Sequence, residues 1–223
     1  MAHEGLWEQL DKLDGTKKAQ RAKCQYLTNP VRYIVTLLNA EYVVNLSDRN
    51  IFSVQSGSPQ SAGHRRKASP SGLTVEPAEF LEQLCILAYL INAQDLPLAD
   101  KLVGAETLPG GQFFFRGLHS LPTKKLEQAF GNHPEVLHRV SAQFDAERCE
   151  FGDASIRLYV LPRLPLTIVI WRRCEEFDAR ASILFDQTAA SQLPLDALLA
   201  AVNLTVGALA KAATEDSKMA SGE

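Results

Sequence analysis

The spacing of hydrophobic residues predicts helices near the N-terminus, in the middle and at the end of the chain. Apolar residues three and four apart predict a short amphipathic helix at the start; they are Leu6, Trp7, Leu10 and Leu13. A broader apolar stripe, with Pro77 near its first turn, predicts the main buried helix; it comprises Phe80, Leu84, Leu87 and Ile91. Residues 193–213 predict a closing helix.

Two further segments carry helical periodicity that prolines interrupt. Residues 19–26 predict one or two helical turns, which end before the break at Asn29 and Pro30. Residues 121–144 predict two helices or one kinked helix, because Pro134 removes a backbone hydrogen bond within the pattern. The inward positions of this segment are Leu126, Phe130, Leu137 and Val140.

Strand patterns fall into two groups. The first is rich in β-branched and aromatic residues with turn residues between, and it predicts an antiparallel meander over 32–38, 41–46 and 51–54. The second group predicts strands within three apolar runs: residues 155–162, 164–173 and 179–186. The phenylalanine-rich segment 112–119, "QFFFRGLH", predicts one more short buried strand.

The order of these elements predicts a single α+β domain with a mostly antiparallel sheet packed against helices. Both strand groups are expected to join one sheet. The expected organisation is an N-terminal helical segment at 1–29, the α+β domain at 30–212 and a disordered tail at 213–223. Within the domain, 55–75 is expected to be a flexible loop, since it holds few apolar residues and the basic tetrad His64-Arg65-Arg66-Lys67.

Composition and charge narrow the classes of partner. The chain has 223 residues, 46% of them hydrophobic, so it can bury a core without disulfides or metals. A net charge of −3 provides no broad positive field, so neither a nucleic acid nor an anionic membrane is an expected partner. The N-terminus lacks the apolar core of a signal peptide, and Arg163 with two prolines interrupts the apolar run 159–171. We therefore expect a cytoplasmic protein without a membrane-spanning helix.

The cysteines and common motifs indicate no metal site and no familiar catalytic site. The four cysteines lie far apart, without a C-x-x-C pair, so free thiols are expected; they are Cys24, Cys85, Cys149 and Cys174. The sequence has no G-x-S-x-G elbow, and "LPGGQ" lacks the spacing of a dinucleotide or phosphate-binding loop.

The stretch "WRRCEEFDARASILFD", residues 171–186, is the strongest candidate for chemistry. If a buried strand ends at Trp171, the acids that follow line its connection to the next strand. One interpretation is a small polar pocket at the strand end, with Trp171 and Phe177 as an apolar wall. The other is a tight hairpin whose acids cap backbone amides and pair with nearby arginines.

Several motifs together resemble an uncharacterised family of mainly anaerobic bacteria and archaea, a domain of unknown function. The resemblance covers about residues 33–210 and rests on "LPGG" at 108–111, "GDA" at 152–154, "LPRLPL" at 161–166 and "LFD" at 184–186. The family pattern Trp-x-x-Asp-Glu-Glu-Phe-Pro is altered here. Cys174 replaces its first acid and Asp178 its proline. The resemblance implies that a site built on that first acid is changed, and it suggests partners among iron–sulfur or corrinoid proteins.

These observations favour a non-catalytic accessory protein that binds a small molecule or cofactor. A corrinoid or another tetrapyrrole is the candidate ligand. The expected ligand-binding residues are Gly110, Gly111, Arg116, Trp171, Glu175, Glu176, Phe177 and Asp186. Two alternatives stay open. One is an interaction subunit of a redox or methyl-transfer assembly, with a protein partner or a second copy docking on an exposed Trp7 stripe. The other is an enzyme that uses the acids in acid–base chemistry.

Overall fold

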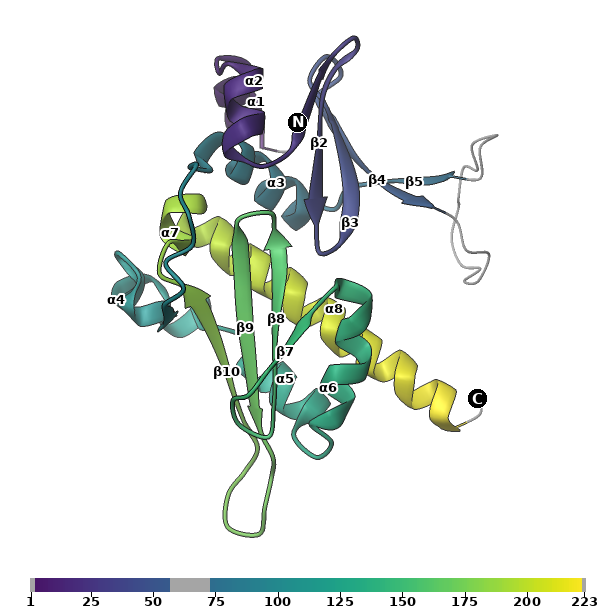
Figure 1. Cartoon of the computed structure of the whole chain (residues 1–223), viewed down its shortest axis with the longest axis vertical. Helices are drawn as coiled ribbons and strands as arrows, with labels where there is room; N and C mark the ends of the chain where they lie inside the picture. Colours follow the sequence, from purple (N-terminus) through teal and green to yellow (C-terminus); the bar gives the residue numbers. More distant parts are fainter. Residues whose placement is uncertain (1–2, 57–72, 222–223) are drawn as a thin grey trace.

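Two antiparallel sheets, rather than the single expected sheet, form the framework of the protein. The computed structural model describes residues 3–56 and 73–221 (Figure 1). The first sheet has the strand order β1-β2-β3-β4-β5, and the second has the order β6-β10-β9-β8-β7. The α+β class is confirmed. Along the chain, the mainly helical residues 80–144, which include the short strand β6, separate the first sheet from the long strands of the second.

The first sheet forms from the N-terminal third of the chain. Its strands are β1 (Gln25–Thr28), β2 (Val31–Leu37), β3 (Ala40–Asn45), β4 (Asn50–Ser56) and β5 (Leu73–Pro77). The three predicted strands are confirmed, whereas β1 and β5 are additional. The helical turns predicted over residues 19–26 are only partly present: α2 ends at Arg21, and strand β1 begins at Gln25. The ends of the predicted 55–75 loop belong to strands, since β4 ends at Ser56 and β5 begins at Leu73. Residues 57–72, which include the basic tetrad, lie outside the described residues.

Helices cover one face of this sheet. They are α1 (Glu4–Asp11), α2 (Gly15–Arg21) and α3 (Phe80–Asn92). The predicted stripe of α1 is buried rather than exposed, since Trp7 and Leu10 are 0% and 1% exposed. Helix α3 is the predicted buried helix, although Phe80 at its start is 61% exposed, with its ring centroid 4.2 Å from that of His3. The segment predicted as 1–29 therefore packs into the same core as α3.

The second sheet has three long central strands and two short edges. Its strands are β6 (Leu102–Gly104), β7 (Glu147–Cys149), β8 (Ala154–Leu161), β9 (Leu164–Trp171) and β10 (Arg180–Asp186). The three predicted strands of this group are confirmed as β8, β9 and β10. The hairpin between β9 and β10 extends beyond the rest of the sheet in Figure 1.

Short helical elements connect the two sheets and flank the second. They are η1 (Ala105–Thr107), α4 (Gly111–Phe114), η2 (Gly117–His119), α5 (Thr123–Phe130), α6 (Glu135–Val140), η3 (Ser141–Phe144) and α7 (Ala189–Gln192). The predicted strand at 112–119 is wrong: Gly110 turns the chain with φ of 76° and α4 follows, with Phe113 75% exposed. The interruption at Pro134 is confirmed, as α5 and α6 are separate helices with buried inward residues.

Helix α8 (Leu195–Ser221) is shared by both halves of the protein. It contacts α3 on the side of the first sheet and α5 and α6 beneath the second (Figure 1). The tail predicted at 213–223 is wrong over its described part, because the helix continues to Ser221. By length and mean hydropathy of 1.5, residues 195–219 also meet the criteria for a membrane span, which the sequence prediction did not anticipate. However, 56% of the apolar window within this helix is buried inside the protein, as in a core helix.

A buried arginine joins the two halves at the turn between β8 and β9. Arg163 is 8% exposed, and its guanidinium donates to the carbonyl oxygens of Arg21 (2.6 Å) and Leu96 (3.2 Å). It also pairs with the carboxylate of Asp95. The same region contains Lys18, whose ammonium group donates to a carbonyl of α3. The Arg163 side chain thus connects α2, the 93–101 loop and the second sheet.

Candidate functional site

Helices cover one face of the second sheet. On the other, called the open face below, Tyr159 is 41% exposed, whereas Thr167 and Val169 of the central strand are 2% and 1% exposed. Side chains of a strand alternate between faces, and those on one face pack against the α5, α6 and α8 layer; they include Ile156, Leu158, Ile168, Ile170 and Phe185. The opposite face carries Arg157 beside Thr167 and Leu184 in one cross-strand row. Helix α8 crosses behind this sheet in Figure 1.

A cavity of about 240 Å³ lies on this open face. Thr167 and Pro165 of β9 and Arg157 of β8 are central to it, and the two edges of the sheet supply its walls. The full lining is Asp100, Leu102, Cys149, Phe151, Arg157, Pro165, Thr167 and Asp186. An apolar surface with a few polar groups is the usual composition of a small-molecule site.

The turn between β7 and β8 forms one wall and depends on a glycine. Gly152 has φ of 57°, and a Cβ there would lie 2.7 Å from the carbonyl oxygen of Ile170. The turn is held by the Asp153 N–H, which donates to that same carbonyl, and by the Asp153 carboxylate, which accepts from the Arg172 N–H at 2.7 Å. This close approach positions Phe151, which is 47% exposed, at the cavity.

Substituting alanine for Gly152 is expected to destabilise the protein by about 2 kcal/mol, because both the left-handed backbone and the backbone approach oppose a side chain. Chemical unfolding in urea measures this change. Gly5 is a suitable control, since a Cβ there meets nothing within 4 Å. Equal effects of the two substitutions would contradict the assigned role of the turn.

The opposite wall is held by Asp186 at the end of β10. Its side chain is 2% exposed, and one carboxylate oxygen accepts from the Ala99 N–H (3.1 Å) and from the N–H (2.9 Å) and hydroxyl (2.6 Å) of Thr188. Burial raises the pKa of this carboxyl, but hydrogen bonds from Thr188, Ala99 and Asp100 outweigh burial and hold the pKa below its usual range. Asp186 therefore fixes the segment that carries Asp100 and Leu102.

Arg157 is the cation of the cavity. Its guanidinium lies 3.7 Å from the carboxylate of Asp100 and its central carbon 5.8 Å from the ring centroid of Tyr159. Asp100 is 78% exposed, so this ion pair is solvated and contributes little stability. An anionic group entering the cavity can take the place of the Asp100 carboxylate at modest cost.

The structure separates the predicted ligand-binding residues into three places. Asp186 lines the cavity, and Trp171 lies on the same face of β9, with the Arg180 guanidinium 5.6 Å from its ring. Gly110, Gly111 and Arg116 belong to α4 and its surroundings. A Cβ on Gly111 would lie 1.9 Å from the Ala105 carbonyl oxygen, so this glycine permits close backbone packing.

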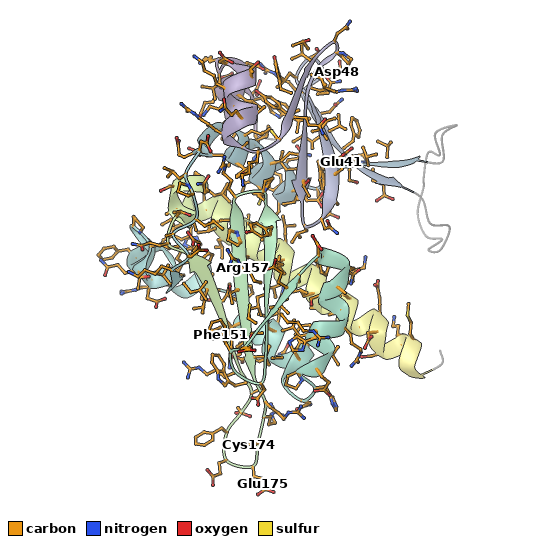
Figure 2. All side chains as sticks on the ribbon, viewed as in Figure 1. Glu41, Asp48, Phe151, Arg157, Cys174 and Glu175 are labelled. Carbon is orange, nitrogen blue, oxygen red and sulfur yellow. The ribbon has the colours of Figure 1, made fainter. Side chains whose placement is uncertain are left out.

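The predicted acids lie at the tip of the β9–β10 hairpin, away from the cavity. Figure 2 places Cys174 and Glu175 at this tip and Phe151 and Arg157 further up the sheet. Phe177 is 69% exposed, so it forms no pocket wall with Trp171. Arg173 pairs with Asp178 at 3.3 Å, which agrees with the hairpin interpretation of this stretch.

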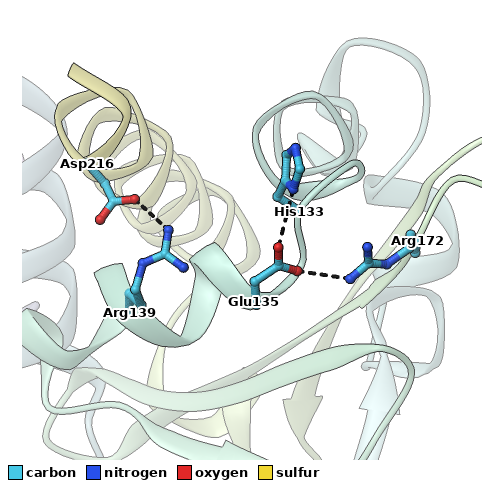
Figure 3. Close-up of polar contacts among 5 residues, drawn as sticks. All are labelled: His133, Glu135, Arg139, Arg172 and Asp216. Atoms are coloured by element: carbon cyan, nitrogen blue, oxygen red, sulfur yellow. Dashed lines mark hydrogen bonds and ion pairs between the residues drawn. The ribbon is translucent and has the colours of Figure 1, made fainter. Parts of the chain in front are cut away.

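Arg172, one of the arginines near the hairpin acids in sequence, bonds to Glu135 of α6 at 2.9 Å instead of to those acids (Figure 3). The pKa of Glu135 is lowered, first by a bond from its own backbone N–H, and also by His133 and Arg172. Arg139 of the same helix pairs with Asp216 of α8 at 2.8 Å. These contacts brace the hairpin, α6 and α8 against one another.

Replacing Glu175 and Glu176 together by glutamine is expected to change the free energy of unfolding by less than about 0.5 kcal/mol, since exposed side chains away from a packed feature contribute little. Urea unfolding with the wild type as reference measures this. A loss of several times that size would show that the hairpin acids belong to the scaffold.

The described cysteines and acids form no cluster of metal ligands, and burial disfavours the thiolate form of three of the four cysteines. All four cysteines are free thiols, and burial raises the pKa of Cys24 and of Cys85 to about 12. Burial also raises the pKa of Cys149, at the edge of the cavity. Within residues 3–56 and 73–221, no three His, Cys, Asp or Glu side chains gather as metal ligands.

Sequence reasoning missed most of the cavity residues, including Arg157, Thr167, Phe151 and Leu102. A signal was present in β8 and β9, where charged or polar residues alternate with apolar ones in "SIRLYV" and "PLTIV". Such alternation marks the outward face of a sheet. It does not show which outward residues a turn or an edge strand encloses.

The fold and the cavity together define an α+β protein of two antiparallel sheets with an open, partly apolar recess on the second. The chain belongs to the family of the domain of unknown function DUF3786, which matches residues 14–208 and so includes every strand of both sheets. No curated protein and no solved structure shows significant similarity to the chain.

Proposed function

We propose that this protein is a non-catalytic accessory protein that binds a small molecule or cofactor on the open face of its second sheet. The observation that supports the proposal is the cavity around Arg157, whose walls come from both edges of the sheet. The ligand has an apolar body and an anionic group. The apolar body contacts Leu102, Phe151 and Pro165, and the anionic group bonds to Arg157.

The size of the cavity sets how a ligand lies in it. At about 240 Å³ it is below the 300–1,000 Å³ of typical enclosed sites, so it surrounds a small ligand or one edge of a larger one. A tetrapyrrole with carboxylate side chains fits the second case. Its ring would lie across the open face toward Tyr159, which is 41% exposed, with one carboxylate at Arg157.

Catalysis by the acidic stretch is the less favoured alternative. General acid–base chemistry needs groups that converge on one substrate atom. Here the acids at 175, 176 and 178 are exposed at a hairpin tip, and Asp186, at the opposite end of β10, has one carboxylate oxygen that already accepts three hydrogen bonds. The other titratable acids of the cavity are Asp100, which pairs with Arg157, and Cys149, whose pKa is raised by burial.

Binding of 1-anilinonaphthalene-8-sulfonate, an aromatic anion, tests the site. Changing Arg157 to glutamine is expected to weaken its binding about tenfold, because a charge-assisted hydrogen bond to the anion is lost. Arg148 is the matched control, since this exposed arginine lies on the adjacent strand opposite Ile156, on the other face. Its change to glutamine should leave the affinity unaltered.

Protein purified without oxygen supplies the second measurement. A visible absorption band or an added mass under native conditions, present in the wild type and absent in the folded Arg157→Gln variant, would identify a resident ligand at this site. Equal probe affinity in the Arg157 and Arg148 variants would contradict the proposed site.

A further inference from the structure

The first sheet also has an open face, and a row of apolar side chains crosses it. Helices α1 and α3 pack on its other face, which carries Tyr33, Val35 and Val44. On the open face Ile34 of β2 pairs with Val43 of β3, which pairs with Phe52 of β4, so the three side chains form one row across the sheet. All three are partly exposed, and none packs against the hydrophobic core.

The apolar surface extends beyond this row. Val54 of β4 pairs with Val75 of β5 on the same face, and Val75 is 38% exposed. Exposed apolar area of this continuity is unusual for a surface that faces water alone and marks sites of association. The face lies on a different sheet from the Arg157 cavity, so the two surfaces are independent.

Two unpaired charges lie on opposite sides of the row. Arg32 precedes Ile34 by two residues on β2, and Glu41 precedes Val43 by two residues on the antiparallel strand β3, so they lie one step to either side of the row. Figure 2 shows Glu41 on β3 in the upper sheet. Among the described residues, neither has an ion-pair or side-chain hydrogen-bond partner, and the Arg32 Nε is buried without an acceptor.

We propose that this face binds a second copy of the same chain, forming a two-fold homodimer. A two-fold axis close to the Ile34–Val43–Phe52 row turns the face onto itself and brings Arg32 of each copy to the row that holds Glu41 of the other, one strand away. Sheets stacked face to face lie about 10 Å apart, a gap that arginine and glutamate side chains span from the two surfaces. The face of one copy, with Arg32 on one side of the row and Glu41 on the other, is therefore complementary in charge to the same face of a second copy.

This self-complementarity selects a second copy over an unrelated partner. Each dimer contains the Arg32–Glu41 contact twice, so a charge reversal at either position places like charges opposite each other at both contacts. An apolar row alone could pack against many apolar surfaces. The flanking charges restrict the partner to one with the opposite order of charges across its row, which a second copy has when rotated by 180°.

Sedimentation equilibrium over a range of protein concentrations tests the proposal. The wild type is expected to be dimeric, and Arg32→Glu or Glu41→Arg alone is expected to weaken dimerisation at least about tenfold. An equimolar mixture of the two single variants is expected to form a heterodimer, because one variant carries only acidic and the other only basic side chains at the two positions. The double variant should recover the wild-type association.

Circular dichroism verifies that each variant is folded, and Glu175→Arg, at the exposed hairpin tip, serves as a charge-reversal control that should leave dimerisation unchanged. A wild-type chain that stays monomeric up to its solubility limit would overturn the proposal. So would single variants that dimerise as the wild type does, or a mixture that shows no more association than its parts.

Discussion

Exchange of Arg163 for methionine is expected to lower the free energy of unfolding by about 3 kcal/mol, because it removes a buried guanidinium from three acceptors. The carbonyl oxygens of Arg21 and Leu96 would lose their donor, and the Asp95 carboxylate its cation. Methionine keeps much of the aliphatic volume, so the change isolates the polar contacts from packing. Asp95 is 55% exposed and recovers hydration, which limits the loss.

Urea denaturation followed by circular dichroism measures this change. Arg173 provides the control, since it is 59% exposed and its single ion pair with Asp178 is solvated. Its exchange for methionine should cost less than about 0.5 kcal/mol. If both variants unfold at the same urea concentration, the role assigned to Arg163 in joining α2, the 93–101 loop and the second sheet is wrong.

Replacement of Asp186 by alanine is expected to cost about 3 kcal/mol, since the N–H groups of Ala99 and Thr188 would be left without their charged acceptor. Asparagine retains an oxygen acceptor and loses the charge, so it should cost about 1 kcal/mol. Because Asp186 positions a wall of the cavity, the alanine variant should also bind the aromatic sulfonate more weakly. A smaller loss for alanine than for asparagine would contradict this account.

The lowered pKa of Asp186 gives a pH dependence with a definite sign. Its folded pKa lies below the unfolded value of about 3.9, so its contribution is complete above that value and is lost as the pH falls through the folded pKa. The difference in unfolding free energy between wild type and the asparagine variant should therefore be constant from neutral pH to about pH 5. It should shrink below about pH 4, which urea titrations at several pH values would measure.

The sequence correctly predicted those helices and strands whose hydrophobic residues recur at a regular spacing. Strands β8, β9 and β10, helices α3 and α8 and the meander of β2, β3 and β4 all follow from such patterns. Strands β1 and β5 escaped prediction because each is short and lies beside a helix or a proline. The phenylalanines at 113–115 suggested a strand, but Gly110 and Gly111 permit a turn and close packing that lead into a helix.

The candidate site was predictable only in part, for a geometric reason. Trp171 and Asp186 share the open face, as alternation along β9 and β10 allows. The acids between them were expected to complete a pocket, yet a hairpin loop carries them past the end of the sheet. The residues that enclose the cavity, Phe151 and Leu102, come from edge segments distant in sequence. Their placement depends on tertiary contacts that no local pattern reveals.

Helix α8 also constrains how the chain folds during synthesis. Its buried residues Leu198, Val202, Val206 and Leu209 complete the core beside α3 and the core beneath the second sheet. Neither half can close until this helix has left the ribosome, although all the described strands have by then been made. Until then the nascent chain exposes the apolar surface that α8 covers and the edge strands of both sheets, which makes it prone to aggregation.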